Sequence, residues 1–86
     1  PTRDLTHSTV GIVGFGGVGR RVSEVLAPFK TKILATDMYP VDKPAHVAEL
    51  WPADRLDDLL RAVDVVILCL PLNAQTRWII TREKLQ

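Results

Sequence analysis

Short apolar runs alternate with amphipathic segments along the chain. The apolar runs lie at residues 10–13, 32–36, 48–51 and 65–70. Between them, residues 18–29 and residues 56–63 repeat apolar side chains at helical spacing. Apolar positions three, four and seven apart form one face of a helix, whereas a short continuous run is typical of a buried parallel strand. The pattern predicts strand, helix, strand, strand, helix and strand, in that order.

This order of elements predicts an α/β fold of the Rossmann type. Right-handed crossovers would give a doubly wound parallel sheet with strand order 3-2-1-4 and a switch point between strands one and four. Asp54 is expected to cap the second helix, and Pro71 is expected to end the fourth strand. Residues 73–77 read as a turn, after which Thr81 would cap a helix that begins at Arg82. The outer edge of the fourth strand is therefore expected to lack a neighbour.

Charge and ligand-forming residues narrow the classes of partner. Eleven basic and ten acidic residues give a formal net charge of +1 and are spread along the chain, which gives no argument for nucleic acid or membrane binding. Cys69 is the single cysteine and lies in an apolar run, so it is predicted to be a core residue in a reducing, intracellular setting. His7 and His46 have no metal-ligand partners at suitable spacing and are expected to be ordinary surface side chains. We expect a soluble protein that binds a small molecule and no metal.

The first predicted strand is followed by the sequence GFGGVG, which fits the pattern GxGxxG. Between a strand and a helix, Gly14 permits a sharp exit, Gly16 leaves room for a pyrophosphate against the backbone, and Gly19 lets the helix pack closely on the sheet. The N–H groups of Gly17 and Val18, at the helix N-terminus, are the expected phosphate donors. The motif alone is weak evidence, and a surface turn that binds no ligand is the alternative.

An acidic residue in a suitable place makes the prediction more specific. Asp37 lies eighteen residues after Gly19, at the end of the second predicted strand. A carboxylate there can accept hydrogen bonds from both hydroxyls of an adenosine ribose. The 2′-phosphate of NADP would face like charge, at a cost on the order of 1 to 4 kcal/mol, and no arginine directly follows Asp37 to offset it. We therefore predict NAD as the cofactor, with a solvated loop aspartate as the alternative.

Two stretches of the chain resemble the D-isomer-specific 2-hydroxyacid dehydrogenases. They are TVGIVGFG at residues 9–16 and, more discriminating, DVVILCLPLNAQT at residues 64–76. The resemblance extends from Leu5 onward and implies that the cofactor is also contacted by Leu70 and Pro71 on the adenosine side and by Thr76. The family often has a basic residue where Gly17 stands and a histidine where Cys69 stands. Phosphate contact at Gly17 is therefore expected through the backbone alone.

The resemblance also implies a larger parent enzyme. Residues 1–86 would be the N-terminal half of its NAD-binding domain, with the rest of that domain and the substrate lobe outside them. The family's catalytic arginine, glutamate and histidine follow the region that matches Gln86, so no residue here is assigned as catalytic. The implied reaction is reversible hydride transfer between nicotinamide and a small D-2-hydroxy or 2-oxo acid of the glyoxylate, hydroxypyruvate or phosphoglycerate type. The parent is expected to be a cytoplasmic homodimer.

Two other functions stay open for a chain of this fold. The first is an NAD-sensing transcriptional corepressor, which would lack the catalytic residues downstream of this region. The second is a formate dehydrogenase, which shares the same cofactor half. No residue of the chain selects formate.

Overall fold

The computed structural model describes the backbone of residues 7–72 and 75–82 and the side chains of residues 7–69. The elements follow one another as β1 (Thr9–Val13), α1 (Gly17–Leu26), η1 (Ala27–Phe29), β2 (Lys32–Asp37), β3 (Glu49–Pro52), η2 (Ala53–Arg55), α2 (Leu56–Ala62), β4 (Val65–Leu72) and β5 (Gln75–Arg82). When η1 is counted as the end of the first helix, the helices and the first four strands lie within two residues of where the apolar pattern predicted them.

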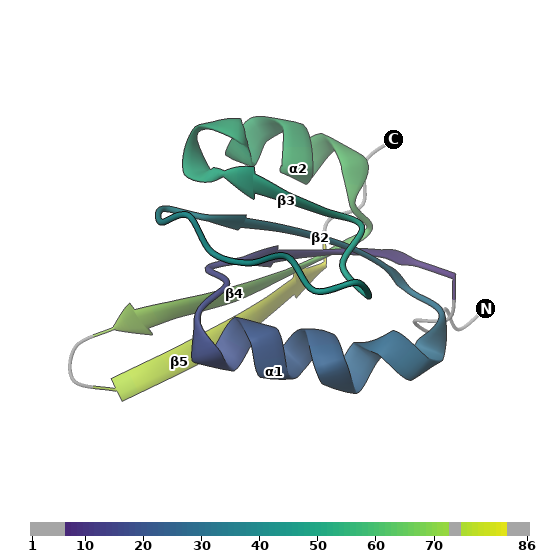
Figure 1. The fold of residues 1–86 in the computed structure, drawn as a ribbon, viewed down its shortest axis with the longest axis horizontal. Helices are drawn as coiled ribbons and strands as arrows, with labels where there is room; N and C mark the ends of the chain where they lie inside the picture. Colours follow the sequence, from purple (N-terminus) through teal and green to yellow (C-terminus); the bar gives the residue numbers. More distant parts are fainter. Residues whose placement is uncertain (1–6, 73–74, 83–86) are drawn as a thin grey trace.

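The five strands form one sheet in the order β3-β2-β1-β4-β5. β1 pairs in parallel with β2 and with β4, and β2 pairs in parallel with β3. The α/β fold and the strand order 3-2-1-4 are thereby confirmed. Figure 1 shows α1 and α2 on opposite faces of the sheet, as in a doubly wound fold. The parallel register places the C-terminal ends of β1 and β2 at the same edge.

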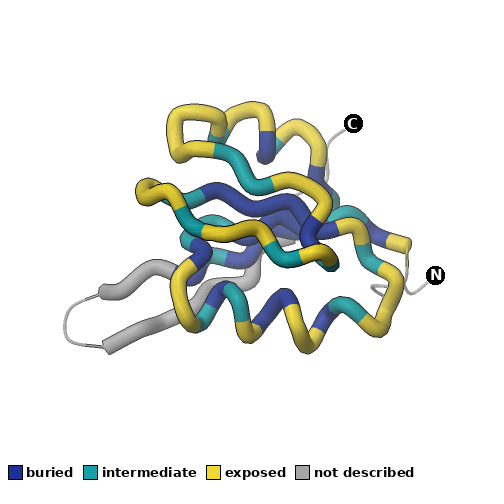
Figure 2. Tube along the Cα trace, viewed as in Figure 1, coloured by how far each residue is buried: buried dark blue, intermediate teal, exposed yellow. Residues whose placement is uncertain are grey.

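Each face of the sheet has its own apolar core. The core under α1 contains Val22 and Leu26 of the helix together with buried residues of the strands, among them Cys69. The core under α2 is built around Leu59 and Val63. Figure 2 shows the central strands buried between helices whose outer surfaces are exposed. The prediction of Cys69 as a core residue is confirmed, and burial raises the pKa of its thiol.

The end of the chain differs from the prediction. β4 continues through Pro71, and residues 75–82 form β5, an antiparallel neighbour of β4, where a turn and the start of a helix were expected. β1 pairs with β4 only as far as Leu68, so the missing N–H of Pro71 costs no bond to β1. Residues 76–81 are mostly β-branched or aromatic, which favours a strand along the open edge of β4. Residues 73–74 and 83–86 lie outside the described residues.

The start of α2 also differs. Asp54 lies inside the η2 turn, and Arg55 occupies the N-cap position with no side-chain cap hydrogen bond. The predicted cap at Asp54 is wrong because the 3₁₀ turn leads directly into the helix. Arg55 instead pairs with Asp58 at 3.0 Å and lies over the ring of Trp51, 4.2 Å from its centroid.

α1 lies unusually close to the end of β1. A Cβ atom at Gly19 would be 2.3 Å from the carbonyl oxygen of Gly14 and 3.2 Å from Cγ2 of Ile12. A Cβ atom at Gly17, two residues earlier in the helix, would meet nothing within 4 Å. The packing role predicted for Gly19 is thereby confirmed. Only a residue without a side chain permits this approach.

We therefore expect Gly19→Ala to destabilise the protein, because the backbone carbonyl of Gly14 cannot move aside as a flexible side chain can. Overpacking of this kind costs about 1 to 3 kcal/mol. Gly17→Ala is the matched control, and its free energy of unfolding should equal or slightly exceed that of the wild type because alanine favours a helix. Urea unfolding followed by circular dichroism measures both. Equal stability of the two variants would contradict the close contact.

Candidate functional site

The turn between β1 and α1 is held by backbone geometry. Gly14 has a φ of 94°, a conformation that side chains disfavour. Its N–H donates to the carbonyl oxygen of Thr36 at 2.9 Å, which continues the pairing of β1 with β2 beyond the last strand residue. Gly16 is the N-cap residue, and α1 begins at Gly17. The chain thus leaves the sheet and enters the helix within three residues.

The N-terminus of α1 is open and lacks competing negative charge. Gly16 and Gly17 are exposed, and the space beside each is free of protein atoms to 4 Å. Among the described residues, no side chain caps α1 and no acidic residue lies in its first turn. The N–H groups of a first helical turn have no acceptor within the helix and carry partial positive charge. An anionic group such as a phosphate would find free donors here.

Asp37 ends β2 directly beside this turn. Its Oδ2 atom accepts the N–H of Phe15 at 2.5 Å, and its Oδ1 atom accepts the N–H of Tyr39 at 2.9 Å. The carboxylate is half-buried, and each of its two oxygens has a fixed donor. A carboxylate has about four acceptor positions, so it can still receive two hydroxyl groups. The structure thus brings together the glycine turn and the acidic residue that the sequence singled out separately.

These groups match the two polar parts of an ADP moiety. Free N–H donors suit the pyrophosphate, and an oriented carboxylate suits the paired ribose hydroxyls. Both lie at the C-terminal edge of β1 and β2, where doubly wound sheets bind their ligands. The residues present therefore fit a dinucleotide.

The remaining predicted contact residues lie on β4 and β5. Leu68 is aligned with Val13, the last residue of β1, so Leu70 and Pro71 continue β4 past that level toward the glycine turn. Thr76 is the register partner of Pro71 on the antiparallel β5. The backbone thus carries all three positions to the same edge of the sheet as the turn.

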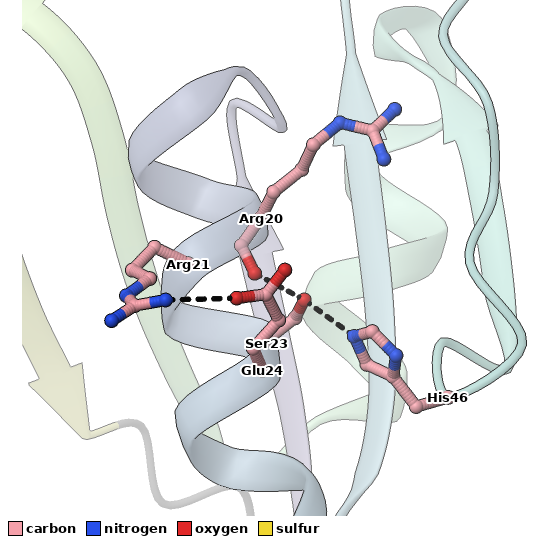
Figure 3. A network of polar contacts seen from close by, with 5 residues as sticks. All are labelled: Arg20, Arg21, Ser23, Glu24 and His46. Carbon is pink, nitrogen blue, oxygen red and sulfur yellow. Dashed lines mark hydrogen bonds and ion pairs between the residues drawn. The ribbon is translucent and has the colours of Figure 1, made fainter.

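Sequence reasoning missed a group of polar contacts on one side of α1. The Nη2 atom of Arg20 donates to the carbonyl oxygen of Asp42 at 2.6 Å, and the Nε2 atom of His46 lies 2.8 Å from Oγ of Ser23. Figure 3 shows Ser23 facing His46, with Arg20 extending from the same helix. His46 is half-buried, so its prediction as an ordinary surface side chain was wrong. The only signal in the sequence was that Arg20 and Ser23 are three residues apart, which places them on one helix face.

Residues 7–72 and 75–82 contain neither a candidate metal site nor a candidate membrane-spanning helix. No group of three or more histidine, cysteine, aspartate or glutamate side chains there could hold a metal ion. No helix in the same part is long and apolar enough to cross a bilayer. His7 is exposed, as expected.

Comparison with known proteins agrees with this geometry. The family model for the D-isomer specific 2-hydroxyacid dehydrogenase, NAD binding domain, matches residues 1–86. A glyoxylate reductase from Thermococcus kodakarensis is 38% identical over 84 residues, which cover 96% of this chain and 25% of that protein. The chain thus spans about a quarter of the length of this relative.

Solved structures show the same fold. A glycerate dehydrogenase related protein from Thermoplasma acidophilum superposes with a TM-score of 0.70 at 33% identity, over 85% of this chain and 25% of that one. An NAD-dependent formate dehydrogenase from Staphylococcus aureus, solved in complex with NAD, has a TM-score of 0.62 at 33% identity, over 81% of this chain and 20% of that one. With its glycine turn, its acidic β2 end and a family match over its whole length, the chain belongs to the NAD-binding domain family of the D-isomer-specific 2-hydroxyacid dehydrogenases.

Proposed function

We propose that this chain binds the ADP half of NAD through the glycine turn and Asp37. The single observation that carries the proposal is the hydrogen bond from the N–H of Phe15 to Oδ2 of Asp37, at 2.5 Å. It joins the end of β2 to the start of the turn, so the ribose acceptor and the phosphate donors keep a fixed relative position. A site in which these two groups moved independently would lose more entropy on binding.

The pyrophosphate contacts are assigned to backbone atoms. Gly14, Gly16 and Gly19 shape the turn, and the N–H groups of Gly17 and Val18 are the proposed donors. A Cβ atom at Gly16 or Gly17 would meet nothing within 4 Å, which supports an approach of the phosphates to the backbone at the helix N-terminus. No basic side chain stands at Gly17, so attraction there comes from oriented N–H groups and the helix dipole.

Asp37 is assigned to the adenosine ribose and to the choice of NAD over NADP. Its oxygens already accept one N–H each, so its orientation is set before the cofactor arrives. A 2′-phosphate would lie next to this carboxylate and be repelled by it. Leu70 and Pro71 on the adenosine side and Thr76 near the cofactor complete the proposed contact set, in keeping with their position at the same edge.

The parent protein is proposed to be an NAD-dependent dehydrogenase of D-2-hydroxy acids, of which this chain is the N-terminal half of the cofactor domain. Bound NAD would supply the hydride acceptor, and the residues of this chain hold and orient it. The family membership and the relative named glyoxylate reductase support small 2-oxo acids, of the glyoxylate, hydroxypyruvate or phosphoglycerate type, as substrates. A cytoplasmic homodimer is part of the same proposal.

The ribose assignment predicts a change in cofactor preference. In the full-length protein, Asp37→Ala should weaken NAD binding by about tenfold or more, because hydrogen bonds to a charged acceptor are lost. The same change should weaken NADP binding much less, because repulsion of the 2′-phosphate disappears. Titration calorimetry with both cofactors measures the two affinities.

Asp42→Ala serves as the matched control for Asp37→Ala. It removes an exposed carboxylate five residues further along and leaves the backbone carbonyl that Arg20 contacts. Its NAD affinity should stay within about twofold of the wild type. An unchanged ratio of NAD to NADP affinity in Asp37→Ala would contradict the ribose assignment.

The proposed activity predicts that the full-length protein oxidises NADH in the presence of glyoxylate, hydroxypyruvate or pyruvate. Loss of NADH absorbance measures this turnover, and NAD with formate is a separate arm of the assay. Tight NAD binding without turnover of any of these substrates would contradict the dehydrogenase and point to a sensor. Turnover of formate alone would reassign the protein as a formate dehydrogenase.

A further inference from the structure

The connection between β2 and β3 has an unusual form for a parallel sheet. Residues 38–48, here called the strap, contain no helix or strand, although parallel strands are usually joined through a helix. In Figure 1 the strap runs back from the end of β2 on the α1 side of the sheet. Val47 is fully buried in the core under α1, and Val41 packs against that core in part. The strap is thus anchored by burial mainly at its far end, next to β3.

The two polar contacts from α1 hold the strap at separate points. Arg20 donates to the carbonyl oxygen of Asp42, and Ser23 contacts His46 one helical turn later. The hydroxyl of Ser23 donates to the carbonyl oxygen of Arg20 at 2.7 Å, so Nε2 of His46 is the donor in the second contact. Along the chain, Asp42 is closer to Asp37 than His46 is, so the contact from Arg20 holds the part of the strap next to Asp37.

Between Asp37 and Asp42, apolar packing holds the strap at Val41, whereas the residues next to Asp37 are exposed. Met38 and Tyr39 are 76% and 70% exposed. The position of Met38 and Tyr39 therefore depends on the packing of Val41 and on two polar contacts, namely the N–H of Tyr39 to Asp37 and the guanidinium of Arg20 to Asp42. Contacts of this kind are lost more easily than packed apolar surface, because water competes for them.

Arg20 also acts on the other side of Asp37. Its guanidinium lies over the ring of Phe15, 4.9 Å from the centroid, and the N–H of Phe15 is the donor to Oδ2 of Asp37. A cation over an aromatic face is held electrostatically. One side chain thus contacts both of the segments whose N–H groups orient the carboxylate.

We propose that Arg20 is a positioning residue that orients Asp37 toward the adenosine ribose of NAD. It does so by holding the strap through Asp42 and the turn through Phe15. The inference rests on the proposed ribose role of Asp37. Arg20 itself is assigned no contact with the cofactor. Phe15 is fully buried, so loss of Arg20 would act mainly by loosening the strap whose Tyr39 N–H holds Oδ1 of Asp37, and binding would then have to order that segment.

The test is a double-mutant cycle in the full-length protein, with NADH affinity measured by titration calorimetry and KM and kcat measured by loss of NADH absorbance. We expect Arg20→Ala to weaken NADH binding about threefold to tenfold, which corresponds to the net contribution of one ordinary intramolecular hydrogen bond. KM for NADH should rise by a similar factor with little change in kcat. In the Asp37→Ala background the same substitution should change affinity less than about twofold, because coupled residues do not contribute additively.

Arg21→Ala is the matched control. Arg21 is the next residue of α1, and its side chain is 79% exposed and pairs only at the surface with Glu24, as Figure 3 shows. The variant removes the same charge near the same helix end, so it reports any long-range attraction to the phosphates. Its NADH affinity should stay within about twofold of the wild type. Urea unfolding of each variant checks that it is folded under the assay conditions.

Three outcomes would overturn the inference. Equal losses of NADH affinity in Arg20→Ala and Arg21→Ala would mean that the effect comes only from removing a positive charge. An equal loss from Arg20→Ala with and without Asp37 would mean that Arg20 acts elsewhere, while the ribose role of Asp37 stands. An Asp37→Ala variant with wild-type NADH affinity would remove the ribose role itself, and the positioning role with it.

Discussion

The close contact of α1 with the end of β1 is the constraint on which the site depends. Because Gly19 has no side chain, the helix lies directly against the carbonyl of Gly14. The N-terminus of α1 therefore lies at the edge of the sheet, and its free N–H groups meet the space beyond β1. The same contact fixes where Arg20 and Ser23 leave the helix and so determines which part of the strap each can reach.

Hydrogen-bond donors and hydrogen-bond acceptors occupy separate parts of the site, only a few backbone residues apart. Phe15 gives its N–H to Asp37, while the following glycines face open space. A carboxylate on the axis of α1, directly beyond its N-terminus, would neutralise the partial positive charge there and repel phosphates. Asp37 accepts the N–H of Phe15, two residues before α1 begins, and does not cap the helix. The arrangement suits a ligand that carries hydroxyls next to phosphates, as the ADP part of NAD does.

Local patterns in the sequence were enough for the layered fold, the strand order and the positions of the glycine turn and Asp37 at the ends of their strands. Two of the features that were missed depend on contacts between distant segments. The strand at residues 75–82 pairs along β4, and its β-branched and aromatic residues favour a strand without specifying that partner. His46 was taken as a surface residue because its partner Ser23 is 23 positions earlier. Aspartate is a residue type that often caps helices, but at Asp54 the cause of the error is local. A 3₁₀ turn begins one residue before it, so Asp54 lies inside that turn.

The strap is an irregular connection beside a binding site whose groups must be precisely placed, so other elements have to restrain it. Pro40 and Pro44 disfavour a helix there, so the strap cannot bury a continuous apolar face as a helix would. Segments with few buried contacts open at low free-energy cost, and a ligand that binds only the closed form stabilises it. The polar contacts from α1 to the strap raise the free-energy cost of opening it. In the proposed site, the helix whose N–H groups would hold the phosphates also restrains the segment that follows Asp37, so one element would join the two halves of the site.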